Sequence, residues 1–109
     1  MKANVVFGKD VILKELGGGT SRKVLAYNEQ MMMVEVHFEQ GAVGSSHTHP
    51  HFQSTYVKEG RFCFTIDGEN VEVSAGDTIA FPSEILHGTV CLEKGILIDV
   101  FTPMREDFI

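Results

Sequence analysis

Residue types that bind metal ions are concentrated in one short stretch of the sequence. His47 and His49 alternate, and Gln53 has the same parity, so an extended segment would project all three side chains in one direction. Two imidazoles at this spacing can reach one ion, and the neutral amide oxygen of Gln53 adds a third contact. His87, at the start of a distant apolar run, is the candidate for the fourth ligand. The four residues predict a site for one divalent metal ion, with zinc, nickel, iron and manganese all compatible.

Two further histidines do not fit this pattern. His51 follows Pro50, which breaks the alternation, so we expect His51 behind the ligands or at the rim of the site. His37 lies between Val36 and Phe38 in a strand-like run, and we expect a structural role for it. Any single histidine of the group could belong to a solvated polar loop. The combination of His-x-His, glutamine and a distant strand histidine favours the metal site.

A second group of polar residues lies near the C-terminus. Asp99 interrupts an apolar run over residues 96–102 and shares a face with Leu97 and Phe101. A carboxylate there is costly unless it is paired or lies in a polar cavity, although an aspartate near a strand end can also reach water. Arg105 follows soon after and either folds back over the same opening or stays solvated. These residues alone leave both questions open.

The elements that must position these side chains are predicted to be strands. Residues 31–38 alternate, with Met32 and Val34 on one face and Met31 and Met33 on the other. Asp67 and Gly68 are typical of a hairpin turn. Further strand-like runs cover residues 22–27, 61–66, 78–81, 86–92 and 96–102. We therefore expect roughly nine or ten short strands in a sandwich or barrel, and only a closing turn over residues 105–109.

Length and composition suit one globular domain. The chain has 109 residues, and 15 acidic against 9 basic residues give a net charge of -6, which argues against nucleic acid as a partner. A small anionic ligand stays possible, because one arginine and one metal ion can dominate the local field. No apolar run approaches the length of a membrane span, and no secretory leader is recognisable, so we expect a cytoplasmic protein. Cys63 and Cys91 lie in separate apolar runs, which predicts reduced, buried thiols.

Gly41, His47, His49 and Gly60 form one motif, and Gly76, Pro82 and His87 form a second. Together the two motifs resemble those of the cupin superfamily. Two positions depart from that pattern, since Gln53 stands where glutamate is usual and Glu84 where glycine is usual. The change at Gln53 leaves only neutral ligands, and the change at Glu84 affects the shape of a turn. The resemblance implies an all-β, single-domain cupin over residues 1–109, a double-stranded β-helix or jelly-roll barrel, with the metal-binding core at about residues 38–101.

The C-terminal pattern Asp99-x-Phe101-x-Pro103-x-Arg105-x-Asp107-Phe108-Ile109 resembles the KdgF-like branch of small cupins, the pectin-degradation proteins. That branch also has glutamine as a ligand. The resemblance implies an enzyme that converts 4,5-unsaturated monouronates, released by pectate and alginate lyases, to open-chain 4-deoxy-5-keto uronates. It assigns the metal to His47, His49, Gln53 and His87, catalysis to Asp99 and Arg105, and sugar binding to Phe101 and Arg105.

Two other functions compete with this interpretation. A metal-dependent dioxygenase is one, although a neutral glutamine in place of a carboxylate ligand disfavours redox iron. A non-catalytic cupin that binds a sugar or another small molecule is the second, because a fold does not determine a function. We also expect a homodimer, since small barrels with exposed apolar strand faces have reason to pair. Residues 31–33, all methionine, could lie at that interface or fill the core.

Overall fold

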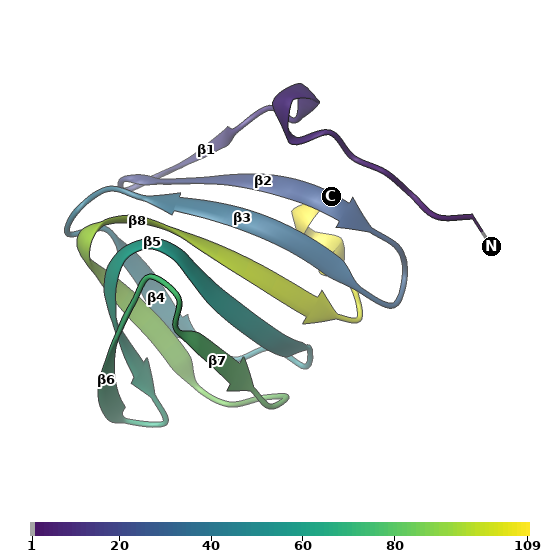
Figure 1. Ribbon diagram of the computed structural model, residues 1–109. Helices are drawn as coiled ribbons and strands as arrows, with labels where there is room; N and C mark the ends of the chain where they lie inside the picture. Colours follow the sequence, from purple (N-terminus) through teal and green to yellow (C-terminus); the bar gives the residue numbers. More distant parts are fainter. Residues whose placement is uncertain (1) are drawn as a thin grey trace.

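Strands make up most of the computed structural model, which describes residues 2–109 (Figure 1). Two single turns of 3-10 helix, η1 (Gly8–Asp10) and η2 (Glu106–Phe108), flank the strands, and η2 confirms the expected closing turn. The all-β class is confirmed, and no helix within residues 2–109 is long and apolar enough to span a membrane. The described strands are β1 (Lys14–Gly17), β2 (Thr20–Tyr27), β3 (Met32–Phe38), β4 (Val43–His47), β5 (Phe52–Ile66), β6 (Glu69–Ser74), β7 (Thr78–Phe81) and β8 (His87–Thr102).

Two long strands, β5 and β8, run through both layers of the fold. They pair antiparallel along nearly their whole lengths, in the strand order β1-β2-β3-β8-β5-β6. The C-terminal half of β8 pairs with β3, while its N-terminal half pairs with β4. In the same way β7 pairs with the first half of β5 and β6 with the second half. Because both long strands bend, as Figure 1 shows, one continuous sheet folds over into two facing layers.

The bend explains why the expected count of nine or ten strands is wrong. Residues 86–92 and 96–102 were expected as separate strands, but β8 continues through them, and residues 2–109 contain eight strands. The chain turns where Gly60 and Gly95 face each other. Gly60 has a φ of 82°, and a Cβ atom on Gly95 would overlap the backbone carbonyl of Glu59. Glycine at both positions lets the paired strands bend together without separating.

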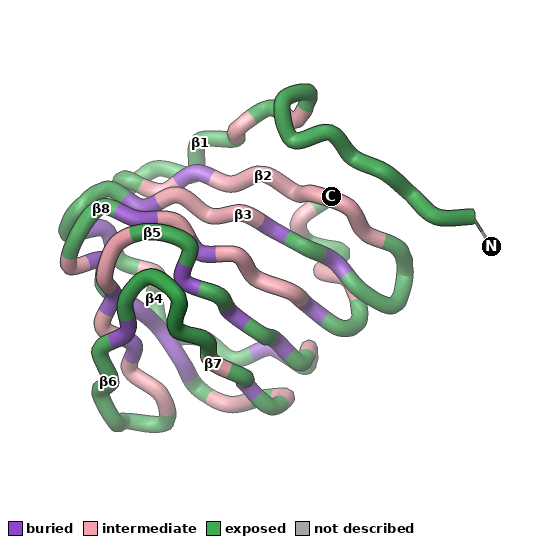
Figure 2. Tube along the Cα trace, viewed as in Figure 1, coloured by how far each residue is buried: buried purple, intermediate pink, exposed green. Residues whose placement is uncertain are grey.

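Alternation along the strands separates the interior from the surface. Met32 and Val34 are fully buried, whereas Met31 and Met33 are about half exposed. Buried and exposed stretches accordingly alternate along part of β3 in Figure 2. The sequence left open where the methionines lie, and the structure places one in the core and two on the surface. Of the two thiols, Cys91 is buried and Cys63 is half-buried, so only the first is as buried as expected, and both are free.

Candidate metal centre and cavity

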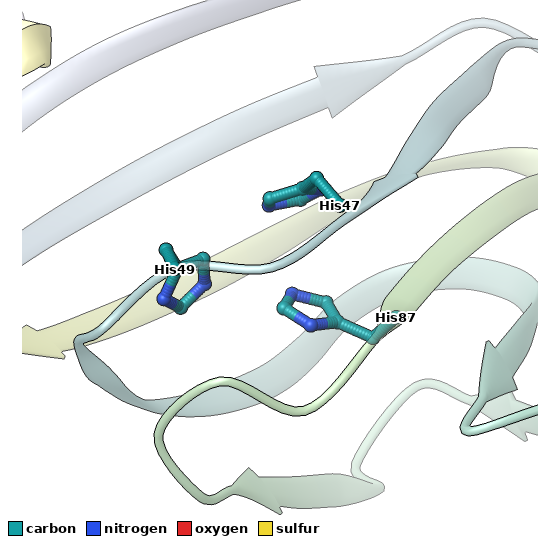
Figure 3. A group of neighbouring side chains, drawn as sticks. All are labelled: His47, His49 and His87. Carbon is teal, nitrogen blue, oxygen red and sulfur yellow. The ribbon is translucent and has the colours of Figure 1, made fainter.

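Three histidines converge at one end of the space between the layers. His47, the last residue of β4, lies directly opposite His87, the first residue of β8. His49 follows in the turn after β4, and its ring points toward the other two (Figure 3). One ring nitrogen from each of the three lies within 4.8 Å of the others. The structure therefore brings together three of the four predicted ligands in a group that could hold a metal ion.

Each of these rings is oriented by the backbone next to it. The Nδ1 atoms of His47, His49 and His87 lie 2.8, 3.1 and 3.0 Å from the carbonyl oxygens of Ser45, His51 and Ile85. A carbonyl oxygen only accepts, so each Nδ1 must carry the proton and donate it. The lone pair of a neutral imidazole then lies on Nε2. This arrangement is typical of metal-binding histidines, whose second nitrogen is held by a hydrogen bond.

Gln53 faces the histidines from the beginning of β5, and it is buried. Its Nε2 group donates to Thr55 Oγ1 at 2.9 Å and to Asp99 Oδ1 at 3.3 Å, which determines the orientation of the amide. Its Oε1 atom therefore lies 2.9 Å from His49 Nε2, so that two lone-pair atoms face each other. A metal ion bound by both atoms would satisfy this arrangement. The donor set thus fits one divalent cation on three imidazoles and an amide oxygen.

The surroundings of His49 and His87 favour their neutral forms. Burial lowers the pKa of His49 and the pKa of His87 below the ordinary histidine value, which favours the unprotonated rings that a metal ion requires. Phe81 stacks on His87 with a centroid distance of 4.5 Å, and Phe101 and His49 pack edge to face with their centroids 5.8 Å apart. Two aromatic rings therefore support the histidines from the apolar side.

Asp99 lies on the same interior face as the candidate ligands. It pairs across the strands with Thr55, whose hydroxyl donates to Asp99 Oδ1 at 2.6 Å. Burial raises the pKa of Asp99 to about 6, although the bonds from Thr55 and Gln53 oppose that rise. Oδ1 accepts both of these bonds, and Oδ2 has no hydrogen-bond partner among residues 2–109. A carboxyl group with one free oxygen and this pKa can both give and take a proton near neutral pH.

Asp99 and three of the candidate ligands, His47, Gln53 and His87, share one cavity of about 280 Å³ with the C-terminal residues. Phe101, Arg105 and Phe108 line it, and the Arg105 guanidinium carbon lies 5.1 Å from the centre of the Phe101 ring. Arg105 therefore folds back over the opening, and its side chain is only 11% exposed. One edge of its guanidinium is already occupied, since Nε and Nη2 donate to the Asp107 carboxylate at 3.0 and 2.8 Å.

The remaining histidines lie outside the group, as the sequence indicated. His51 Nε2 donates to the carbonyl oxygen of Met104 at 3.2 Å, which ties the turn after β4 to the C-terminal segment. His37 lies on the outer face of β3, 2.6 Å from the carboxylate of Glu35.

Two residues in or near the cavity were not singled out from the sequence. Thr55 has the same parity as Gln53, which was a usable signal, and Arg22 is a polar residue at an interior position of β2.

The turn that leads into His87 keeps its shape despite the departure at Glu84. Glu84 adopts a φ of 68°, in the left-handed region where glycine is usual. Its backbone N–H donates to the carbonyl oxygen of His49 at 2.9 Å, and Ser83 Oγ donates to the carbonyl oxygen of Pro50 at 2.6 Å. These two bonds join the two turns that carry candidate ligands.

Comparisons with known proteins identify the family of this chain. Residues 34–101 match the cupin domain family. The chain is 43% identical over 98 residues to the pectin degradation protein KdgF of Dickeya dadantii, covering 88% of this chain and 89% of that protein. An RmlC-like cupin from Shewanella frigidimarina superimposes with a TM-score of 0.94 at 41% identity, over 99% of this chain and 97% of that one. KdgF from Halomonas sp. also superimposes with a TM-score of 0.94, at 34% identity, over 99% of this chain and 100% of that one.

The motif residues, the folded-over sheet and these matches lead to one conclusion. The chain belongs to the cupin family, and within that family to the group of KdgF proteins.

Proposed function

We propose that the protein is a metal-dependent enzyme that converts 4,5-unsaturated monouronates to open-chain 4-deoxy-5-keto uronates. Its relatives include a pectin degradation protein, and pectin is a polymer of uronates. The observation that carries the proposal is the Asp99 carboxyl group in a cavity that is also lined by Arg105 and by His47 and His87 of the histidine group. Such a cavity offers an acid, a cation and a metal site to a small anionic sugar.

The metal would be held by His47, His49, Gln53 and His87. All four ligands are neutral, so a bound dication keeps its full charge and supplies Lewis acidity toward an oxygen of the substrate. Zinc, nickel, iron and manganese remain candidates for this site.

Asp99 is the proton carrier of the proposed reaction. Opening the cyclic enol ether requires a proton at C4 and water at C5, after which the hemiketal opens to the C5 ketone. The hydrated C1 aldehyde then loses water, so the product is an isomer of the substrate. Asp99 Oδ2 donates the proton to C4 and recovers one from the attacking water. Thr55 and Gln53 hold Oδ1 in place and leave Oδ2 directed at the substrate.

Arg105 and Phe101 would bind the sugar. The Arg105 edge that Asp107 does not occupy is available to the substrate carboxylate through a charge-assisted hydrogen bond. Phe101 packs its ring beside Arg105 and His49, where it would cover one face of the sugar and exclude water. Asp107 neutralises part of the Arg105 charge and holds the guanidinium in position.

The test uses the loss of the substrate's conjugated alkene absorbance. Purified protein is mixed with unsaturated galacturonate, with and without chelator, and the spontaneous rate is subtracted. We expect an acceleration that chelator abolishes, that metal restores and that Asp99→Asn removes while metal stays bound. Binding of the uronate without loss of absorbance would instead favour a sugar-binding cupin. Turnover that depends strictly on O₂ would favour a dioxygenase.

We also propose a homodimer through the outer face of the layer formed by β3, β8, β5 and β7. One row across this face is mostly apolar, with Met33 paired to Val100, and with Ser54 paired to both Val100 and Ala80. Met33 is 42% and the neighbouring Tyr56 47% exposed. A second copy of the chain would bury this surface by two-fold symmetry. A cytoplasmic location remains a prediction from the sequence.

Light scattering after gel filtration tests the dimer. Met33→Glu places a charge in the centre of the face, and we expect it to yield monomers. Val71→Glu, at an equally exposed apolar position on β6, is the matched control and should leave the mass unchanged. A monomeric wild-type protein, or a dimer that Met33→Glu does not affect, would contradict the proposal.

A further inference from the structure

The cavity around Asp99 continues beyond the candidate metal centre. A second compartment of about 180 Å³ shares Asp99, Phe108 and three further lining residues with the first. Its other walls come from the β1–β2 hairpin and β4, where Thr20 and Arg22 are the polar residues. Asp99 therefore lies between two compartments, with the candidate metal ligands on one side and Arg22 on the other.

Arg22 presents unused hydrogen-bond donors to this second compartment. Its guanidinium carbon lies 3.9 Å from the centre of the Phe108 ring, and η2, yellow in Figure 1, thereby packs against β2. The residue is half-buried, and burial lowers the pKa of its guanidinium. No side chain or carbonyl between residues 2 and 109 accepts a hydrogen bond from it, in contrast to Arg105 and its partner Asp107. A half-buried guanidinium without acceptors is ready for a ligand that brings them.

We infer that Arg22 binds the hydroxyl groups on C2 and C3 of the unsaturated uronate and selects between substrates that differ in their configuration. This inference rests on the proposed function. With the carboxylate at the metal and Arg105, and with C4 beside Asp99, the C1–C3 part of the ring enters the second compartment. The only carboxylate of a monouronate is then at the far end, so hydroxyl oxygens are the acceptors left for Arg22.

Thr20 completes the match to a diol. Its Oγ1 donates to the carbonyl oxygen of Gly17 at 2.9 Å, so the lone pairs of that oxygen remain to accept from a sugar hydroxyl. Thr20 and Arg22 are two residues apart on β2, so their side chains project from the same face. One donor group and one acceptor group at set positions distinguish a trans from a cis 2,3-diol, because only one geometry satisfies both.

The alternative is that Arg22 serves only to hold Phe108, and through it Arg105, whose guanidinium carbon lies 4.3 Å from the same ring. The two roles differ in their effect on selectivity. Loss of a support would slow all substrates alike. Loss of a contact to the diol would change the ratio between isomers.

The experiment measures kcat and KM for two unsaturated monouronates, one with the trans 2,3-diol derived from galacturonate and one with the cis 2,3-diol derived from mannuronate. Arg22→Met keeps the apolar stem and the contact with Phe108, and Arg22→Lys restores a charged donor. Lys23→Met removes the same charge from the outward-facing neighbour on β2, which pairs with Glu35, and is the control. Metal content is measured for every variant.

For Arg22→Met we expect kcat/KM for the better isomer to fall by about tenfold to a hundredfold, mainly through KM, with metal content unchanged. The ratio between the two isomers should collapse toward one, and Arg22→Lys should recover part of it. An equal loss for both isomers, no loss at all, or a wild-type protein that does not discriminate would overturn the inference while leaving linearisation intact. A wild-type protein that converts neither isomer would refute the proposed function, and the inference would fall with it.

Discussion

Replacing Asp99 by asparagine should stabilise the metal-free protein at neutral pH while it abolishes turnover. Burial raises the pKa of the Asp99 carboxyl from its ordinary 3.8 to about 6. A carboxyl whose pKa is raised on folding favours the folded state most strongly below its unfolded pKa, and that contribution is lost as pH rises toward the folded pKa. Above pH 6 the folded protein therefore holds an ionised carboxylate at a cost that an unfolded chain avoids.

The magnitude follows from the two pKa values. Their difference corresponds to roughly 3 kcal/mol at pH 7.5 and to about 1 kcal/mol at pH 4.5. An asparagine carries no charge, and its Oδ1 can still accept from Thr55 Oγ1 and Gln53 Nε2. Asp99→Asn should therefore raise the free energy of unfolding by about these amounts, with a gain that grows with pH.

Urea unfolding of chelator-treated protein at both pH values measures the gain. Asp10→Asn removes the same charge from an exposed position in η1 and should change the stability little at either pH. A variant that gains nothing at pH 7.5, or gains equally at both values, would refute the reasoning about burial. Full turnover of the metal-loaded variant would separately refute the role of Asp99 as proton carrier.

Three further substitutions test the geometry of the turn, the bend and the amide ligand. Glu84→Gly should raise the free energy of unfolding by up to about 1 kcal/mol in urea titrations, because glycine accepts the positive φ without strain, and Glu84→Ala should give no gain. Gly95→Ala should lower the free energy of unfolding by several kcal/mol or prevent folding, since the new Cβ atom would overlap the carbonyl of Glu59. A stable, metal-binding variant would contradict the described bend. Gln53→Glu should bind metal at least tenfold more tightly in titrations yet turn over more slowly, because a carboxylate beside Asp99 repels it or captures its proton. Tighter binding with faster turnover would show that the hydrogen bond from the Gln53 amide to Asp99 is dispensable.

Local patterns predicted the parts of the site that depend on alternation. His47, His49 and Gln53 were recognised by parity alone, and Asp99 stood out as the one charged residue in an apolar strand. Whether Asp99 would be paired or solvated was not predictable, because its partner Thr55 lies 44 residues away in the sequence and meets it only through strand register.

The features that were missed depend on contacts between distant segments. Arg22 lies at an interior position of β2 and packs against Phe108 of the C-terminal turn, and nothing near Arg22 in the sequence indicates that contact. The occupation of one edge of Arg105 by Asp107 depends on the local turn geometry, which spacing alone does not specify. The continuity of β8 was missed because residues 86–92 and 96–102 were expected as two strands, whereas Gly95 between them lets two paired strands bend together.

The shared pairing of β5 and β8 also makes bound metal a reporter of correct folding. A slip of one residue between these strands would exchange Asp99 for Ile98 or Val100 opposite Thr55 and would turn Gln53 away from His49. Misregistered chains would therefore retain a sheet but lose both the ligand and the proton carrier. The fraction of molecules that takes up one metal ion would then count the molecules with native register, which a circular dichroism spectrum of the sheet cannot do.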